Sequence, residues 1–200
     1  MLNLMSASEK NIQAAIAYPP LVMRILSPDD HSAFEEVHLE KQKTESATLK
    51  QLKGYRPRPA SEILLPDSKD DFTYLDLDEA AQGVHFLLTG EAFGGEPPLN
   101  FLFGHGVGIY HLDVGYGPVK LFDADLVVRV VKALATQSDD ALRKRFSVDT
   151  MNELEVYPGN WGDEWDIDDP LDYLMRNVSA LRSYLGDVVR EERGLLAYIP

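Results

Sequence analysis

Apolar residues recur along the chain with two different periods, and each period predicts a different kind of element. Helical spacing, with an apolar residue at every third or fourth position, predicts helices at about 77–89, 124–134 and 171–192. Alternating or short continuous apolar runs predict strands at 99–103, 107–112, 119–122 and 195–199. These elements do not form regular βαβ units. The pattern therefore indicates an α+β fold, in which a small mixed or antiparallel sheet packs against several helices.

The beginning of the chain is expected to be helical. Ser6 and Glu9 have the spacing of a capping box, which predicts a helix that Pro19 and Pro20 end. A short apolar segment follows, and Asp29 or Asp30 can cap the next helix.

The stretch 54–72 is rich in proline and mixed charge, which is typical of a surface loop or hinge. We therefore expect an N-terminal helical part over 1–60 and an α+β core over 61–200. The two are expected to form one compact domain.

The segment LDLDEAAQGVHFLLTG, residues 75–90, carries the marks of a well-defined helix. Asp76 is expected at its N-cap with Glu79 as the reciprocal partner, and Gly90 is placed to end it. Gly83 costs a helix about 1 kcal/mol against alanine, so we expect a closely packed neighbour there. Phe86 lies opposite the apolar stripe, which predicts a helix buried between two layers.

Composition narrows the classes of partner. The formal net charge is -14, from 33 acidic against 19 basic residues, which disfavours nucleic acids and anionic membranes but permits a basic protein partner. The absence of cysteine excludes disulfides, thiolate metal sites and cysteine nucleophiles. Without a signal peptide or an apolar run of roughly 20 residues, we expect a cytoplasmic protein.

Histidines are the first candidates for chemistry. His85 is expected either as a packed residue whose ring bonds a backbone carbonyl, which we favour, or as a base or ligand facing a groove. His105, His111 and Asp113 could suggest a metal site, but on a strand the two histidines would lie about 20 Å apart. We expect no metal and no cofactor.

Loops carry the remaining candidates. The glycines of GHGVG lack dinucleotide-binding spacing. The acidic loop GDEWDIDD favours the start of the longest helix through its dipole, or forms a docking patch with Trp161 and Trp165 as aromatic anchors. The stretches GYGP and YPGNW place Tyr116 and Tyr157 on rigid turns, which either serve structure alone or hold function. One candidate cleft combines five side chains: His85, Glu96, Tyr116, Tyr157 and Trp161.

Five stretches in this order resemble the YfbM-like family, a bacterial family of small α+β proteins with a domain of unknown function. They are LDLDEAAQGVHFLLTG, GEPPLNFL, DVGYGPVKLF, VYPGNW and LDYLMRNVSALRSYL. The resemblance covers about two thirds of the chain, from Leu75 onward, and implies no established reaction, cofactor or catalytic residue. Family members tend to carry tryptophan and a polar residue before the helix glycine, where this chain has Ala81 and Gln82.

Two functional hypotheses follow. The first is a non-catalytic protein-binding module for a basic partner; the resemblance, through genes of a type found near toxin and secretion clusters, adds an immunity-type role. The alternative is a small-molecule-binding protein or hydrolase-like enzyme with a cleft near His85. The chain carries no G-x-S-x-G elbow, P-loop or H-E-x-x-H motif, so whether it is an enzyme stays open, with the balance against.

Overall fold

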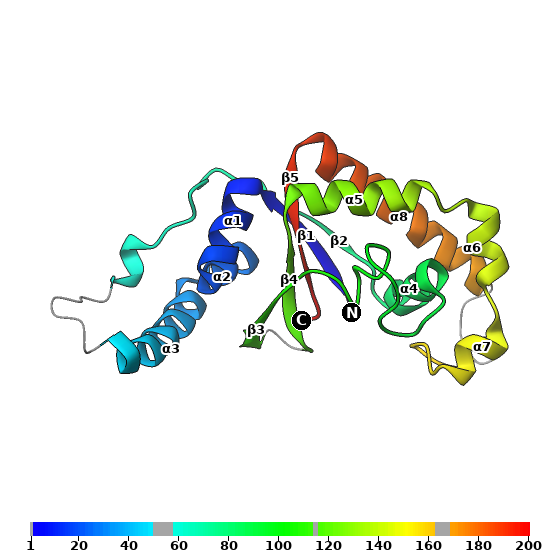
Figure 1. Ribbon diagram of the computed structural model, residues 1–200, viewed down its shortest axis with the longest axis horizontal. Coiled ribbons are helices and arrows are strands. Elements are labelled where there is room, and N and C mark those ends of the chain that lie inside the picture. Colours follow the sequence, from blue (N-terminus) through cyan, green and yellow to red (C-terminus); the bar gives the residue numbers. More distant parts are fainter. Residues whose placement is uncertain (1, 50–57, 114–115, 163–168) are drawn as a thin grey trace.

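A five-stranded antiparallel sheet stands between two groups of helices in the computed structural model (Figure 1). The structure describes residues 2–49, 58–113, 116–162 and 169–200. The strands are β1 (Asn3–Ser8), β2 (Thr73–Asp76), β3 (Val107–Asp113), β4 (Pro118–Phe122) and β5 (Arg193–Tyr198), in the spatial order β2-β1-β5-β4-β3. The α+β prediction is confirmed, and the sheet is antiparallel rather than mixed.

The two strands farthest apart in sequence pair at the centre of the sheet. Strands β1 and β5 align over six positions, from Asn3 opposite Tyr198 to Ser8 opposite Arg193. Both chain ends therefore lie beside each other at one end of the sheet (Figure 1). Because β1 is an interior strand, the first sixty residues and the rest of the chain share one sheet.

Side chains alternate across the sheet, and each face contributes to a separate apolar core. In β4, Val119 and Leu121 belong to the core beneath the N-terminal helices, whereas Phe122 belongs to the core beneath the other helices. Lys120 lies on the same side as Phe122, two residues away. The alternation thus turns a lysine toward an enclosed face instead of toward solvent.

The larger core lies under five helices. They are α4 (Ala80–Thr89), α5 (Ala124–Ala135), α6 (Asp139–Arg145), α7 (Val148–Glu153) and α8 (Pro170–Arg190). Asp123 and Ser138 cap α5 and α6 by accepting bonds from Leu126 N and Ala141 N. Helix α7 was not predicted. It is short, and its only fully buried residue is Met151.

Helix α4 is buried on all sides, as the position of Phe86 predicts: every residue from Ala80 to Leu88 is buried. Gly83 has the expected close neighbours, because a Cβ at this position would lie 2.7 Å from side-chain atoms of both Leu174 and Trp161. Gly90 ends the helix in the left-handed conformation, with φ of 81°.

The N-terminal helices cover the opposite face of the sheet. They are α1 (Glu9–Ala17), α2 (Val22–Leu26) and α3 (His31–Leu49), with 3-10 turns η1 (Pro19–Leu21) and η2 (Ala60–Glu62). Asp30, one of the two predicted caps, accepts hydrogen bonds from the backbone of Ser32 and Ala33 at the start of α3.

Three local predictions are wrong, the first two because the residues belong to paired strands. The expected capping box at Ser6 lies inside β1, so the N-terminal part is not purely helical, and Ser8 caps α1 instead. Asp76 ends β2, and α4 begins only at Ala80. The segment 99–103 forms turns and no strand, with the Asn100 carbonyl accepting bonds from Gly104 N and His105 N.

Candidate functional site

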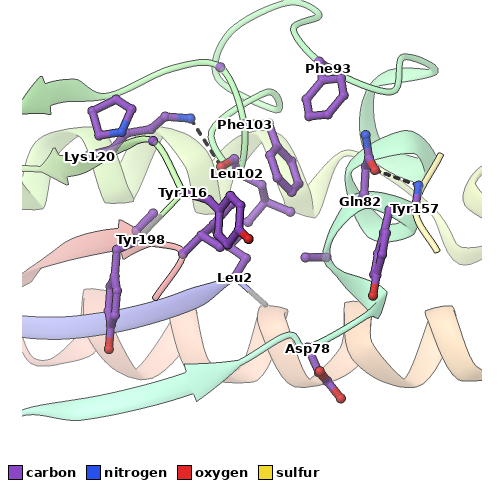
Figure 2. Close-up of a pocket in the computed structure, with 16 residues that line it drawn as sticks. Leu2, Asp78, Gln82, Phe93, Leu102, Phe103, Tyr116, Lys120, Tyr157 and Tyr198 are labelled. Carbon is purple, nitrogen blue, oxygen red and sulfur yellow. Dashed lines mark hydrogen bonds between the residues drawn. The ribbon is translucent and has the colours of Figure 1, made fainter. Parts of the chain in front are cut away.

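A cavity of about 850 Å³ opens at the end of the sheet where the two chain ends lie. Its wall combines the start of β1, helix α4, the turns of 99–104, the β3–β4 turn and the end of β5 (Figure 2). The side chains and backbone that line it come from Leu2, Asp78, Ala81, Gln82, Phe93, Leu102, Phe103, Gly104, Tyr116, Gly117, Pro118, Lys120, Tyr157, Ala197, Tyr198 and Ile199. The lining is predominantly apolar.

Three exposed aromatic side chains stand around the mouth of this cavity. Phe93, Tyr116 and Tyr157 keep 66%, 79% and 54% of their surface exposed, although they line the cavity. Phe93 meets Phe103 edge to face, with ring centroids 5.7 Å apart. Aromatic rings at an opening offer apolar area while their edges or hydroxyls stay in water.

Gln82 connects helix α4 by hydrogen bonds to the loops that carry two of these rings. It is 5% exposed, its amide nitrogen donates to the Ala92 carbonyl at 3.1 Å, and its amide oxygen accepts from Tyr157 N at 2.7 Å (Figure 2). One buried side chain thereby fixes the backbone beside Phe93 and the backbone of Tyr157. On the other side, Tyr116 N donates to the Ile199 carbonyl at 3.0 Å.

Lys120 supplies the cationic group of the cavity wall. Its ammonium donates to the Leu102 carbonyl at 3.4 Å, which is a long bond (Figure 2). Within the described part of the chain it forms no ion pair, although the protein is strongly acidic. Asp78, the acid that lines the cavity, lies across it (Figure 2). Burial lowers the pKa of Lys120 from 10.5 to about 8.

His85 lies directly behind the cavity wall. It is fully buried, and its ring meets Phe103 edge to face at 5.3 Å between centroids. Burial lowers its pKa to about 4, the charge of Lys120 acts in the same direction, and the Gly94 backbone opposes them in part. Neither ring nitrogen forms a hydrogen bond of standard geometry with the described residues, and the Gly94 backbone is the group that interacts with the ring. The ring is neutral at pH 7.

The structure brings some of the predicted site residues together and separates others. Tyr116 and Tyr157 line the cavity, His85 reaches it only through Phe103, and the exposed Glu96 is not part of its wall. Trp161 is 1% exposed and donates from its indole to the Val156 carbonyl at 2.7 Å. Its interpretation as an exposed anchor is therefore wrong, because the indole fills the space that Gly83 leaves.

Other predicted features fall outside what can be located. Trp165 and most of the acidic loop lie in 163–168, outside the described residues, as do the side chains of His111 and Asp113. Among the residues whose side chains are described, no three acids and histidines converge as metal ligands. No helix in these same ranges is long and apolar enough to cross a membrane.

Sequence reasoning missed Lys120 and gave Gln82 no structural role. Each is a polar residue inside an apolar element, PVKLF for Lys120 and AAQGVHFLL for Gln82, but this pattern alone does not show whether the polar group is enclosed. In such a position the polar group must be enclosed if both faces of the element are covered.

This geometry defines an α+β protein with an open, mostly apolar cavity, whose wall holds one amine that no described acidic residue pairs with. The chain matches the family model described as "Domain of unknown function (DUF1877)" over residues 3–198, so it belongs to this family. YfbM from Escherichia coli, a protein of unknown function with a crystal structure, is similar in fold: the TM-score is 0.58 at 19% identity, covering 98% of each chain. The YfbM-like resemblance is thereby confirmed. The search of curated proteins gives no match.

We expect the substitution Lys120→Met to preserve the fold and to raise the free energy of unfolding at pH 7. The change removes a half-buried ammonium that has no acidic partner among the described residues, and it keeps an unbranched apolar stem. The gain should shrink as the pH rises from about 8 toward 10.5, because the wild-type lysine then becomes neutral in both states. Urea denaturation measures this change in the free energy of unfolding. Lys132→Met, at an exposed position of α5, is the matched control and should change stability by less than about 0.5 kcal/mol.

Proposed function

We propose that this protein binds a small amphipathic organic molecule in the cavity at the end of the sheet. The ligand has an apolar or aromatic body and one oxygen acceptor, which docks on the Lys120 amine. The observation that carries the proposal is the combination of a largely apolar cavity with a single half-buried amine that no acidic side chain of the described residues neutralises.

Size and lining support a ligand of this kind. A volume of about 850 Å³ lies in the upper part of the range of roughly 300–1,000 Å³ that small-molecule sites span. Such sites are mostly apolar and hold a few polar groups that fix the orientation of the ligand. Here Leu102 and Phe103 would cover the ligand body, while Tyr116 and Tyr157 would contact the end nearest the mouth.

The charge of Lys120 favours a hydrogen-bond acceptor over a donor at the inner end of the ligand. An ammonium held away from water gains more from an oxygen acceptor than a solvated one does, because the competing water is already removed. An amine or guanidinium in the ligand would instead be repelled by Lys120. The binding of a basic protein partner, an immunity-type role and a cytoplasmic location remain predictions from the sequence.

A thermal-shift comparison tests the proposal. The probes are 3-phenylpropanoate, benzoate, decanoate and, as the charge-reversed counterpart, 3-phenylpropylamine. We expect one or more of the carboxylates to raise the melting temperature, with about 2.7 kcal/mol added at 100 times the dissociation constant, and the amine to have no effect. Lys120→Met should abolish the shift and Lys132→Met should keep it. Equal shifts in wild type and Lys120→Met, or none with any carboxylate, would rule the proposal out.

A further inference from the structure

The lysines of the chain differ in their surroundings. Most described lysines are exposed on the surface: Lys10, Lys43, Lys69, Lys132 and Lys144. Lys120 alone among the described lysines lines the large cavity, on the face of β4 that it shares with Phe122. A reagent small enough to enter the cavity therefore reaches one lysine amine whose surroundings differ from those of the surface lysines.

The surroundings of Lys120 favour its neutral, nucleophilic form. No carboxylate of the described residues holds it as an ammonium, and its one protein partner is the Leu102 carbonyl at 3.4 Å. With the pKa lowered to about 8, roughly one molecule in ten carries a free amine at pH 7, against roughly one in three thousand for an ordinary lysine. A desolvated lysine of this kind is the form that attacks carbonyl carbons.

We propose that Lys120 captures an aldehyde or ketone in the cavity as a reversible imine. This inference rests on the proposed function, because it uses the same cavity, and it names the acceptor of the ligand as a carbonyl oxygen. The Nζ lone pair forms a bond to the carbonyl carbon while the carbonyl oxygen takes a proton, which gives a carbinolamine. Loss of that oxygen as water leaves a carbon–nitrogen double bond. Amine and carbonyl are consumed, imine and water are formed, and no oxidant or reductant takes part.

The wall of the cavity indicates which carbonyl compounds fit. Leu102 and Phe103 lie beside the amine and offer apolar area to a ring or branched chain (Figure 2). Asp78 is the one acidic side chain of the lining, and it disfavours a negative charge on the ligand toward that side. The preferred compounds are accordingly uncharged aldehydes or ketones with an aromatic or branched aliphatic body.

Reductive trapping on the full chain provides the test. The protein is incubated with limiting 3-phenylpropanal and sodium cyanoborohydride at pH 7, and the labelled lysines are located by peptide mass mapping. A trapped imine adds the mass of the aldehyde less one oxygen atom. We expect Lys120 to be labelled at least about ten-fold faster than Lys132, as the difference in free amine requires. The preference should shrink as the pH rises above about 8, because Lys120 then gains little further free amine.

Two comparisons separate this inference from the proposed function. Lys120→Met should lose the fast label, whereas Lys132→Met should keep it, and 3-phenylpropanoate, which has no reactive carbonyl, should slow the labelling of Lys120. Labelling at equal rates on Lys120 and Lys132 overturns the imine. If the carboxylates still shift the melting temperature through Lys120, the binding function survives that result. If neither effect depends on Lys120, both proposals fall.

Discussion

The substitution Asp70→Ala is expected to lower the free energy of unfolding by about 3–5 kcal/mol, because it takes the close carboxylate partner from a nearly buried guanidinium. Asp70 Oδ1 lies 2.8 Å from Arg193 Nη2, and the two side chains are only 1% and 13% exposed. The second carboxylate oxygen accepts from Ser8 N at 2.7 Å and from Asn11 Nδ2 at 2.8 Å. One carboxylate thus joins the segment before β2 to β5 and to the junction of β1 and α1.

Urea denaturation at pH 7 measures this effect, and the neighbouring Asp71 provides the control. The side chain of Asp71 is exposed, so Asp71→Ala should change stability by less than about 0.5 kcal/mol. The double variant Asp70→Ala, Arg193→Met should cost less than the sum of its single changes, since the second substitution removes the stranded charge. A loss below about 1 kcal/mol for Asp70→Ala would show that the pair contributes little.

The network around Asp70 also explains which parts of the fold could be predicted from the sequence. Helices α5 and α8 follow from their own residues, because each has an apolar stripe and a capping side chain at its start. Strands β1 and β2 do not. Asn3–Ser8 becomes a strand because it pairs with β5, some 190 residues away, and its local capping pattern is overridden by that pairing.

The residues that line the cavity also divide into those that a local sequence pattern indicates and those that only the fold reveals. Tyr116 and Tyr157 could be selected from the sequence because glycine and proline mark their loops. Lys120 could not, because a lysine between Val119 and Leu121 resembles a solvent-facing residue of a half-buried strand. Only the position of β4, with helices on both faces of the sheet, turns that alternation into burial.

Trp161 illustrates a second limit of sequence reasoning. Its neighbours YPGNW suggest an exposed aromatic residue on a turn, yet its indole is packed against Gly83 and lies edge to face with Phe146 at 6.4 Å between ring centroids. The glycine was predicted to have a close neighbour, but its identity depended on a contact between residues 78 positions apart. The sequence indicates the space beside Gly83 and the large side chain of Trp161 as two separate features. Only the folded structure shows that the indole fills this space.

The stability of the protein is expected to fall as the pH drops below about 6.5, and His85 is expected to cause a large part of the loss. In the folded state burial lowers the pKa of His85 to about 4, whereas the unfolded chain has the ordinary value of 6.5. Between these values the unfolded state binds a proton that the folded state does not, so its contribution is complete above pH 6.5 and is lost toward pH 4. The full difference corresponds to about 3 kcal/mol.

Comparing wild type with His85→Leu isolates this contribution. Measurements at about pH 7.5 and about pH 5.2 stay above the isoelectric point of 4.7, so the protein remains negatively charged. Over that interval the wild type should lose about 1.7 kcal/mol more than the variant, whatever the difference in packing between them. The exposed His31 is the control, and His31→Gln should keep the wild-type dependence. Equal pH dependence in wild type and His85→Leu would mean that the buried ring takes up its proton as readily in the folded protein as in the unfolded chain.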